Sequence, residues 1–157
     1  MGTVTERRDD DPGRAAAWQD LVLAAHLLEA ALERQSQRDG TISHGHFKVL
    51  LLLNAAEDRT LGLKTLAGTL RFSPSRVSHT LTVLERQGLV TRGRVPEGRR
   101  AYEATLTPSG RRLVARVLRG QREEIRDAIF DNLGPSGTAT LGALSARVIK
   151  VLDEMTG

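Results

Sequence analysis

Apolar residues recur at intervals of three and four along most of this chain, which is the spacing of one face of an α-helix. The first such stripe runs from Trp18 to Leu32. Its segment opens at Asp11-Pro12, an N-cap followed by proline at the first helical position, and ends before Asp39-Gly40. The pattern predicts a long first helix with a single apolar face.

The second predicted helix is apolar nearly all round, so we expect it to lie at the centre of the fold. Ser43 is its expected N-cap, and Ile42 and Phe47 have the spacing of a hydrophobic staple across that cap. The apolar run continues to about Ala56.

Two shorter helices and a hairpin are predicted next. Residues 63–70 form the third helix, and Ser73-Pro74 begins a fourth that stops at Gly88. Residues 89–95 and 101–106 are β-compatible runs on either side of a turn-forming loop. A helix-turn-helix followed by a hairpin is the pattern of a winged helix-turn-helix, a module that binds duplex DNA.

Two further helices follow the hairpin. Thr107-Pro108 begins the fifth, and Leu133-Gly134-Pro135 separates it from the sixth. The first, fifth and sixth helices each carry an apolar stripe that a winged-helix core could not wholly cover. We expect these stripes to pack against a second copy across a twofold axis. The alternative is that they form an intramolecular bundle.

Together these elements predict a mainly α fold of six helices with a small β-hairpin wing. With 157 residues, of which 39% are hydrophobic, the chain is long enough for one domain with its own core. We expect a single domain over residues 1–157, in which 42–106 form the winged helix-turn-helix lobe and 12–38 and 108–155 form the dimerisation helices.

Charge is concentrated on the predicted DNA-binding segment. Residues 59–122 contain fourteen cationic side chains and three acidic ones, a net +11, so the remaining residues must carry −7 within the total of +4. Such a segregated field suits a polyanionic partner. Aromatic residues make up only 3% of the chain, which weighs against single-stranded nucleic acid, since that is bound by stacking bases on exposed rings. We therefore expect double-stranded DNA as the partner.

Helical projection assigns the two faces of the fourth helix. At about 100° per residue, Val77, Leu81 and Leu84 fall on one side, which we expect to be buried. The opposite side offers hydroxyls, one imidazole and guanidinium groups, which can reach base edges and phosphates in a major groove. A merely solvated polar face is the alternative interpretation. The residues expected to contact DNA from this helix are Ser73, Ser75, Arg76, Ser78, His79, Thr82 and Arg86.

Four arginines cluster around the turn of the hairpin. We expect Arg94, Arg99 and Arg100 to contact DNA. Of these, Arg99 or Arg100 would enter a narrow minor groove, where the potential is most negative. For Arg92 and Arg94, a solvated charge cluster is the competing interpretation.

Metal binding and catalysis find no support in the sequence. There is no cysteine, and His44 and His46 lack the four-residue spacing with which two helical histidines share a metal, so we expect no metal site. No pairing of nucleophile and base, phosphate loop or pair of carboxylates is apparent, so we expect neither an enzyme nor a cofactor.

The residues also suggest an effector pocket between the first two helices and the DNA-binding lobe. The residues expected to line this pocket are Trp18, His26, His44 and Phe47. The alternative is that Trp18 belongs to the core, as a tryptophan on a helix more often does.

The first 14 residues are charged and lack the apolar centre of an export signal. The longest purely apolar runs, 21–25 and 49–53, are too short to cross a bilayer. We therefore expect a soluble, cytoplasmic protein.

Residues 63–113 also carry a collinear series of motifs. These motifs are Leu66-Ala67, Ser73-Pro74-Ser75, Val77-Ser78, Leu84-Glu85, Gly88-Leu89-Val90, Arg92, Arg99-Arg100, Leu106-Thr107-Pro108 and Gly110. The series resembles the MarR (multiple antibiotic resistance regulator) family of winged-helix transcription factors. The predicted order of six helices and one wing extends the resemblance over residues 12–155.

This resemblance implies an obligate homodimer on a palindromic operator, usually regulating nearby genes in response to a small, often aromatic and anionic ligand. Two positions depart from the family pattern: Gly98 stands where aspartate usually precedes the paired arginines, and Arg71 occupies a turn that often has glycine. Our hypothesis is a ligand-responsive, homodimeric transcriptional repressor. The alternative is a winged-helix protein-interaction module without specific DNA binding.

Overall fold

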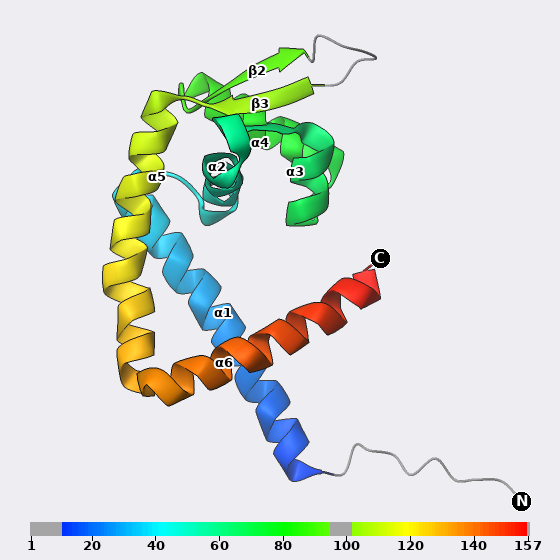
Figure 1. The fold of residues 1–157 in the computed structure, drawn as a ribbon, viewed down its shortest axis with the longest axis vertical. Coiled ribbons are helices and arrows are strands. Elements are labelled where there is room, and N and C mark those ends of the chain that lie inside the picture. The colour runs from blue at the N-terminus through cyan, green and yellow to red at the C-terminus, as the bar shows by residue number, and fades with distance from the viewer. Residues whose placement is uncertain (1–10, 95–101, 157) are drawn as a thin grey trace, which may run out of the picture.

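The structure is a computed structural model, and it describes residues 11–94 and 102–156. A lobe of short helices and strands occupies one end of the molecule. Residues 12–40 and 108–126 lead away from this lobe, and the C-terminal helix turns back toward it (Figure 1). The elements in chain order are α1 (Pro12–Gly40), α2 (His44–Ala55), the 3-10 helix η2 (Glu57–Arg59), β1 (Thr60–Gly62), α3 (Leu63–Leu70), α4 (Pro74–Arg86), β2 (Val90–Arg94), β3 (Tyr102–Leu106), α5 (Pro108–Gln121), the π-helical turn η3 (Arg122–Arg126) and α6 (Asp127–Thr156).

The helix starts are fixed by local side-chain chemistry. Each of the four predicted N-caps accepts a hydrogen bond from a backbone N–H in the first turn of its helix, which satisfies a donor that would otherwise lack an intrahelical partner. These confirmed caps are Asp11, Ser43, Ser73 and Thr107.

The wing belongs to a three-stranded antiparallel sheet in the order β1-β3-β2, whereas the sequence predicted only the two strands of the hairpin. In β1, Thr60 pairs with Thr105 of β3, and their hydroxyl oxygens lie 2.8 Å apart. A strand of three residues is too short to show an alternating pattern of apolar and polar positions. It is therefore the pairing with β3, and not the local sequence, that stabilises this strand.

The core of the lobe forms around α2, as its apolar sequence predicted. Phe47, Leu50 and Leu53 of this helix have no exposed surface. Gly110 packs so closely at the start of α5 that an added Cβ would collide with the carbonyl oxygen of Leu89. The other fully or almost fully buried apolar residues are Val49, Leu66, Val77, Leu81, Leu84, Val90, Ala104, Val114 and Val117.

Helix α5 runs beside the C-terminal half of α1 and connects the lobe to α6 (Figure 1). The side-chain amide of Gln35 on α1 donates to the carbonyl oxygen of Val117 on α5 at 3.0 Å, which ties the two helices together. The chain turns at Gly134, whose φ of 66° interrupts the helical backbone. The predicted break is therefore confirmed, but no sequence pattern predicted the π turn that joins α5 to α6.

The two long terminal helices leave their apolar faces uncovered. Trp18 on α1 is 65% exposed, and Ile149 and Leu152 on α6 are 58% and 55% exposed. The intramolecular bundle is therefore not formed, because it would bury these side chains.

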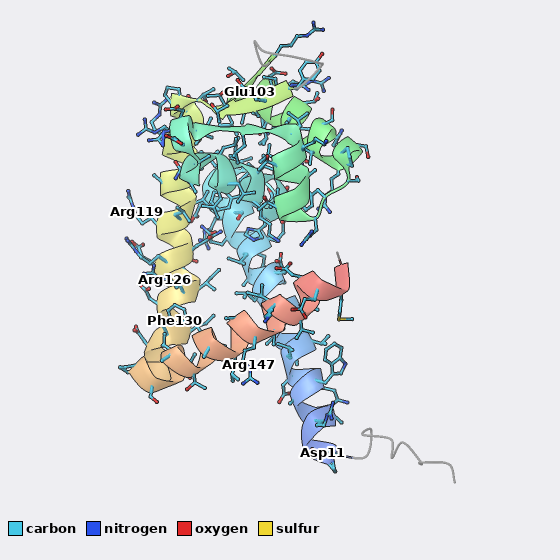
Figure 2. The ribbon with its side chains drawn as sticks, turned by 45° about the vertical axis from the view of Figure 1, so that its right-hand side comes forward. Asp11, Glu103, Arg119, Arg126, Phe130 and Arg147 are labelled. Atoms are coloured by element: carbon cyan, nitrogen blue, oxygen red, sulfur yellow. The ribbon has the colours of Figure 1, made fainter. Side chains whose placement is uncertain are left out.

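No helix among the described residues is long and apolar enough to cross a membrane. Figure 2 shows how extended the chain is, with Glu103 of the sheet at one end and Asp11 at the other.

Candidate nucleic-acid interface

Helix α4 lies in the lobe with one face buried and the other exposed. Val77, Leu81 and Leu84 are fully buried, as the helical projection predicted. Thr80 is also buried, at 2% exposure, and was not predicted. The opposite face, with Ser75 and His79, is open to solvent. Helices α3 and α4 are therefore arranged as a helix-turn-helix with the second helix presented outward.

The turn between these helices contains a residue in the left-handed region. Arg71 has a φ of 53° and a ψ of 36° as the C-cap of α3. The Phe72 N–H donates to the Ala67 carbonyl oxygen at 3.1 Å, which closes the end of the helix. The Arg71 guanidinium pairs with the carboxylate of Asp153 on α6 at 3.2 Å, so the end of α6 reaches the helix-turn-helix.

The N-terminus of α4 presents several polar groups at one exposed edge. The Ser73 hydroxyl caps the helix by accepting from the Arg76 N–H at 3.2 Å, and it lies 3.1 Å from the Ser75 hydroxyl. The Arg76 guanidinium carbon sits 3.7 Å from the centre of the Phe72 ring, a cation–π contact that orients an exposed arginine. The positive end of the helix dipole points the same way. This edge therefore favours a phosphate.

The middle of the outward face carries Ser78, His79 and Arg86, all exposed. Thr82 is only partly exposed, and its hydroxyl donates to the Ser78 carbonyl oxygen at 3.0 Å, so this donor is used within the helix. The face combines a hydroxyl, an imidazole and a guanidinium, which can each bond to DNA.

A second histidine adjoins this surface, and sequence reasoning did not place it there. Burial lowers the pKa of His46 on α2, and the charges of His79 and Arg76 lower it further. His46 follows Gly45, where an added Cβ would lie 3.5 Å from the Arg76 guanidinium, so the start of α2 lies beside α4. No cluster of three or more metal-ligating side chains occurs among the described residues.

Arg92 is held by an acidic partner at the base of the wing. Its guanidinium donates to one carboxylate oxygen of Glu85 at 2.7 and 2.9 Å, and its backbone N–H donates to the other at 3.3 Å. Hydrogen bonding to Arg92 lowers the pKa of the Glu85 carboxyl. Arg92 therefore joins β2 to α4, which explains why it need not face DNA.

The two strands of the wing carry an exposed arginine and an exposed tyrosine side by side. Arg94 pairs across the ladder with Tyr102, and its guanidinium carbon lies 5.8 Å from the centre of the tyrosine ring. Tyr102 was not predicted as part of the site, although its position opposite Arg94 in the hairpin was a usable signal. The predicted DNA contacts Arg99 and Arg100 lie outside the described residues.

The structure does not bring the four predicted effector residues together within one protomer. Phe47 is fully buried and His44 is 7% exposed, so both belong to the packed lobe. The His44 ring nitrogen Nδ1 lies 3.5 Å from the Ser36 hydroxyl. Trp18 lies eighteen residues before Ser36 on the same helix, a distance of about 27 Å at the usual helical rise. Trp18 and His26 are exposed on the part of α1 that leaves the lobe.

Comparisons with known proteins agree with this geometry. The sequence profile of the MarR family matches residues 41–101. The structure of Sco3205, a MarR family transcriptional regulator from Streptomyces coelicolor in complex with DNA, is 32% identical, with a TM-score of 0.84, and the match covers 90% of this chain and 92% of that one. A search of curated proteins found no match.

Two more distant structures share the fold. AbsC, a MarR family transcriptional regulator from Streptomyces coelicolor, is 23% identical with a TM-score of 0.80, covering 92% of this chain and 97% of that one. NadR in complex with 4-hydroxyphenylacetate is 24% identical with a TM-score of 0.69, covering 96% and 99%.

The exposed face of α4, its flanking sheet and the position of the two helices define a winged helix-turn-helix protein. The length and identity of the match to Sco3205 show further that the chain belongs to the MarR family of transcriptional regulators. It is a DNA-binding regulator of that family.

Proposed function

We propose that the protein acts as a homodimeric repressor that binds a palindromic operator in a sequence-specific manner. The observation that carries this proposal is the exposed, polar and cationic face of α4 beside the wing. Helix α4 of each protomer would enter a major groove of the DNA. The wing arginines Arg94, Arg99 and Arg100 would contact the DNA backbone or the minor groove. A twofold dimer requires an operator with matching symmetry.

The uncovered apolar faces of α1 and α6 support the homodimer. A cavity of about 400 Å³ lies between α1, α5 and α6, and its lining is mainly apolar, including Leu28, Ile125 and Phe130. A large exposed apolar surface is rare on a monomer and marks an interaction site. A second copy of the chain would cover these faces and hold two copies of α4 at a fixed separation.

We also propose that a small aromatic or anionic effector binds the dimer, in a pocket to which both protomers contribute. Because Trp18 lies about 27 Å along α1 from Ser36, the residue that approaches His44, a pocket that uses all four residues requires the partner's α1. The ligand in the NadR structure, 4-hydroxyphenylacetate, is an aromatic anion of the kind that the family resemblance implies. Such a ligand releases DNA only if it binds the DNA-incompetent arrangement more tightly.

Duplexes selected from a random pool test the proposal directly. We expect a symmetric consensus, one dimer per duplex, and an affinity about a thousandfold or more above that for a scrambled duplex. The logarithm of the affinity should fall steeply with the logarithm of the salt concentration, because cationic side chains displace counterions from phosphates. Equal affinity for the two duplexes, or no salt dependence, would favour the protein-interaction module instead. A promoter–reporter fusion carrying the selected site would then give the sign of regulation.

A further inference from the structure

A second cationic site lies away from α4, where the end of α2, η2 and the start of α5 meet. A cavity of about 520 Å³ is lined there by three arginines, Arg59, Arg111 and Arg112. No acidic residue lines this cavity. The neighbouring Glu57 and Asp58 are exposed and do not contribute to its wall. The site is separate from the exposed face of α4, and it shares only Leu118 with the apolar cavity beside α6.

The three arginines that line this cavity have no acidic partner among the described residues, unlike Arg38, Arg71 and Arg92. Among the described residues, the guanidinium groups of Arg59 and Arg111 make no hydrogen bond or ion pair. The guanidinium of Arg112 donates only to the Ser109 hydroxyl, at 2.8 Å. Arg59 is also partly buried. An anionic ligand would supply the missing partner.

The remaining lining indicates what kind of anion fits. Val114 and Ala115 of α5 provide an apolar wall, and Asn54 of α2 adds an amide that can donate or accept. Pro108 places the first turn of the 14-residue helix α5 at the rim, where the positive end of its dipole adds to the field. Guanidinium groups bind phosphate and carboxylate oxygens in paired hydrogen bonds. Three cations beside an apolar wall suit a ligand with two negative charges and an apolar part.

We propose that this three-arginine pocket binds a small organic dianion, such as a phosphate monoester or a dicarboxylate that carries an apolar group. The claim concerns a site outside the α4 face, and it does not depend on how the protein reads DNA. Because α5 connects the lobe to α6, a ligand held here would also contact the element that links DNA binding to dimerisation.

The probe for this proposal is 1-naphthyl phosphate, titrated into the full-length protein by calorimetry at low salt. Uncharged 1-naphthol tests the apolar part alone, and inorganic phosphate tests the charge alone. We expect the phosphate monoester to bind more tightly than either. Arg59→Gln and Arg111→Gln should each weaken it by about tenfold or more, since each removes a charge-assisted hydrogen bond.

Arg119→Gln is the matched control. Arg119 lies on the same helix, is exposed, lines none of the cavities described above, and projects outward from α5 in Figure 2. Its substitution should leave naphthyl phosphate binding unchanged. Arg111 is also exposed, so Arg111→Gln gives a readout even if Arg59→Gln disturbs folding.

Several results would overturn the proposal. The first is that naphthyl phosphate does not bind at millimolar concentration. The second is that its affinity is unchanged in both Arg59→Gln and Arg111→Gln. The third is that Arg119→Gln loses as much affinity as the pocket variants, which would indicate general charge attraction. If the pocket variants instead lose affinity for duplex DNA while the wild-type protein binds no naphthyl phosphate, the arginines contact DNA phosphates and the small-anion site does not exist.

Discussion

Arg71 shows how one residue can hold a turn at some expense of stability. Its left-handed backbone is unfavourable for a side chain with a Cβ, and glycine avoids this penalty. We expect Arg71→Gly to raise the free energy of unfolding by about 1 kcal/mol, because the exposed ion pair with Asp153 contributes little. Urea unfolding measures the change. Arg71→Ala is the control, since it removes the same ion pair but keeps the Cβ, and equal stabilities of the two variants would contradict the explanation.

The pH dependence of stability should report the burial of His44. Burial lowers the pKa of His44 from its ordinary value of 6.5, and the nearby Lys48 adds to the shift. Glu29 and Glu33 oppose it. The unfolded chain therefore takes up the proton at a higher pH than the folded protein. The free energy of unfolding should fall as the pH drops below about 6.5 and level off once the folded state is protonated.

Unfolding measured between pH 8 and 5 checks this sign. His44→Gln should reduce the slope, whereas His26→Gln, at an exposed position, should keep the slope of the wild-type protein. His46 also has a lowered pKa, so some slope should remain. A stability that rises on acidification, or a slope unchanged in His44→Gln, would refute the role given to burial.

Side-chain periodicity predicted the residues of α4 well, but it could not predict partners from other elements. The buried positions Val77, Leu81 and Leu84 follow from geometry within one helix. His46 approaches α4 only through the packing of α2, and neither local pattern nor charge signals that contact. The same limit explains why Trp18 and His44 were grouped in one pocket, since the length of α1 separates them.

At the scale of elements, the Glu85–Arg92 pair should fasten the wing to α4. Glu85→Ala removes the acceptor of the Arg92 N–H and of its guanidinium. We expect amide exchange in β2 to accelerate by roughly fivefold, because the strand loses its hydrogen bonds to α4. Exchange in α2 should not change. Glu57→Ala, at an exposed position, is the control, and equal exchange rates in the two variants would show that the pair does not restrain the wing.

Element boundaries with a local chemical cause were predictable, and those set by tertiary contacts were not. The caps at Ser43, Ser73 and Thr107 and the break at Gly134 each depend on one or two residues of the sequence. Strand β1 depends on pairing with β3, and the π turn lies inside an uninterrupted helical pattern. Neither carries a local signal.

For the whole molecule, the exposed face of α6 should be needed for dimerisation. Leu144 is 52% exposed in the protomer, and Leu144→Asp would place a charge in the proposed interface. We expect the dimer dissociation constant to rise about thirtyfold or more, the effect of losing ~2 kcal/mol at an interface hot spot. Ser145→Asp, one residue along the same helix, is the control. Sedimentation would contradict the proposal if both variants remain dimers at the concentration at which the wild-type dimer begins to dissociate.

The most direct test of the account is whether α4 reads the bases of the operator. His79 lies on the exposed face of this helix, so His79→Ala should bind the selected duplex less tightly and should lose its preference at one base pair of each half-site. The measurement is the affinity of wild-type protein and His79→Ala for every single-base variant of that duplex. A loss of about 1–3 kcal/mol confined to one position is the predicted result. An unchanged affinity for every duplex would contradict the claim that the exposed face of α4 is the recognition surface.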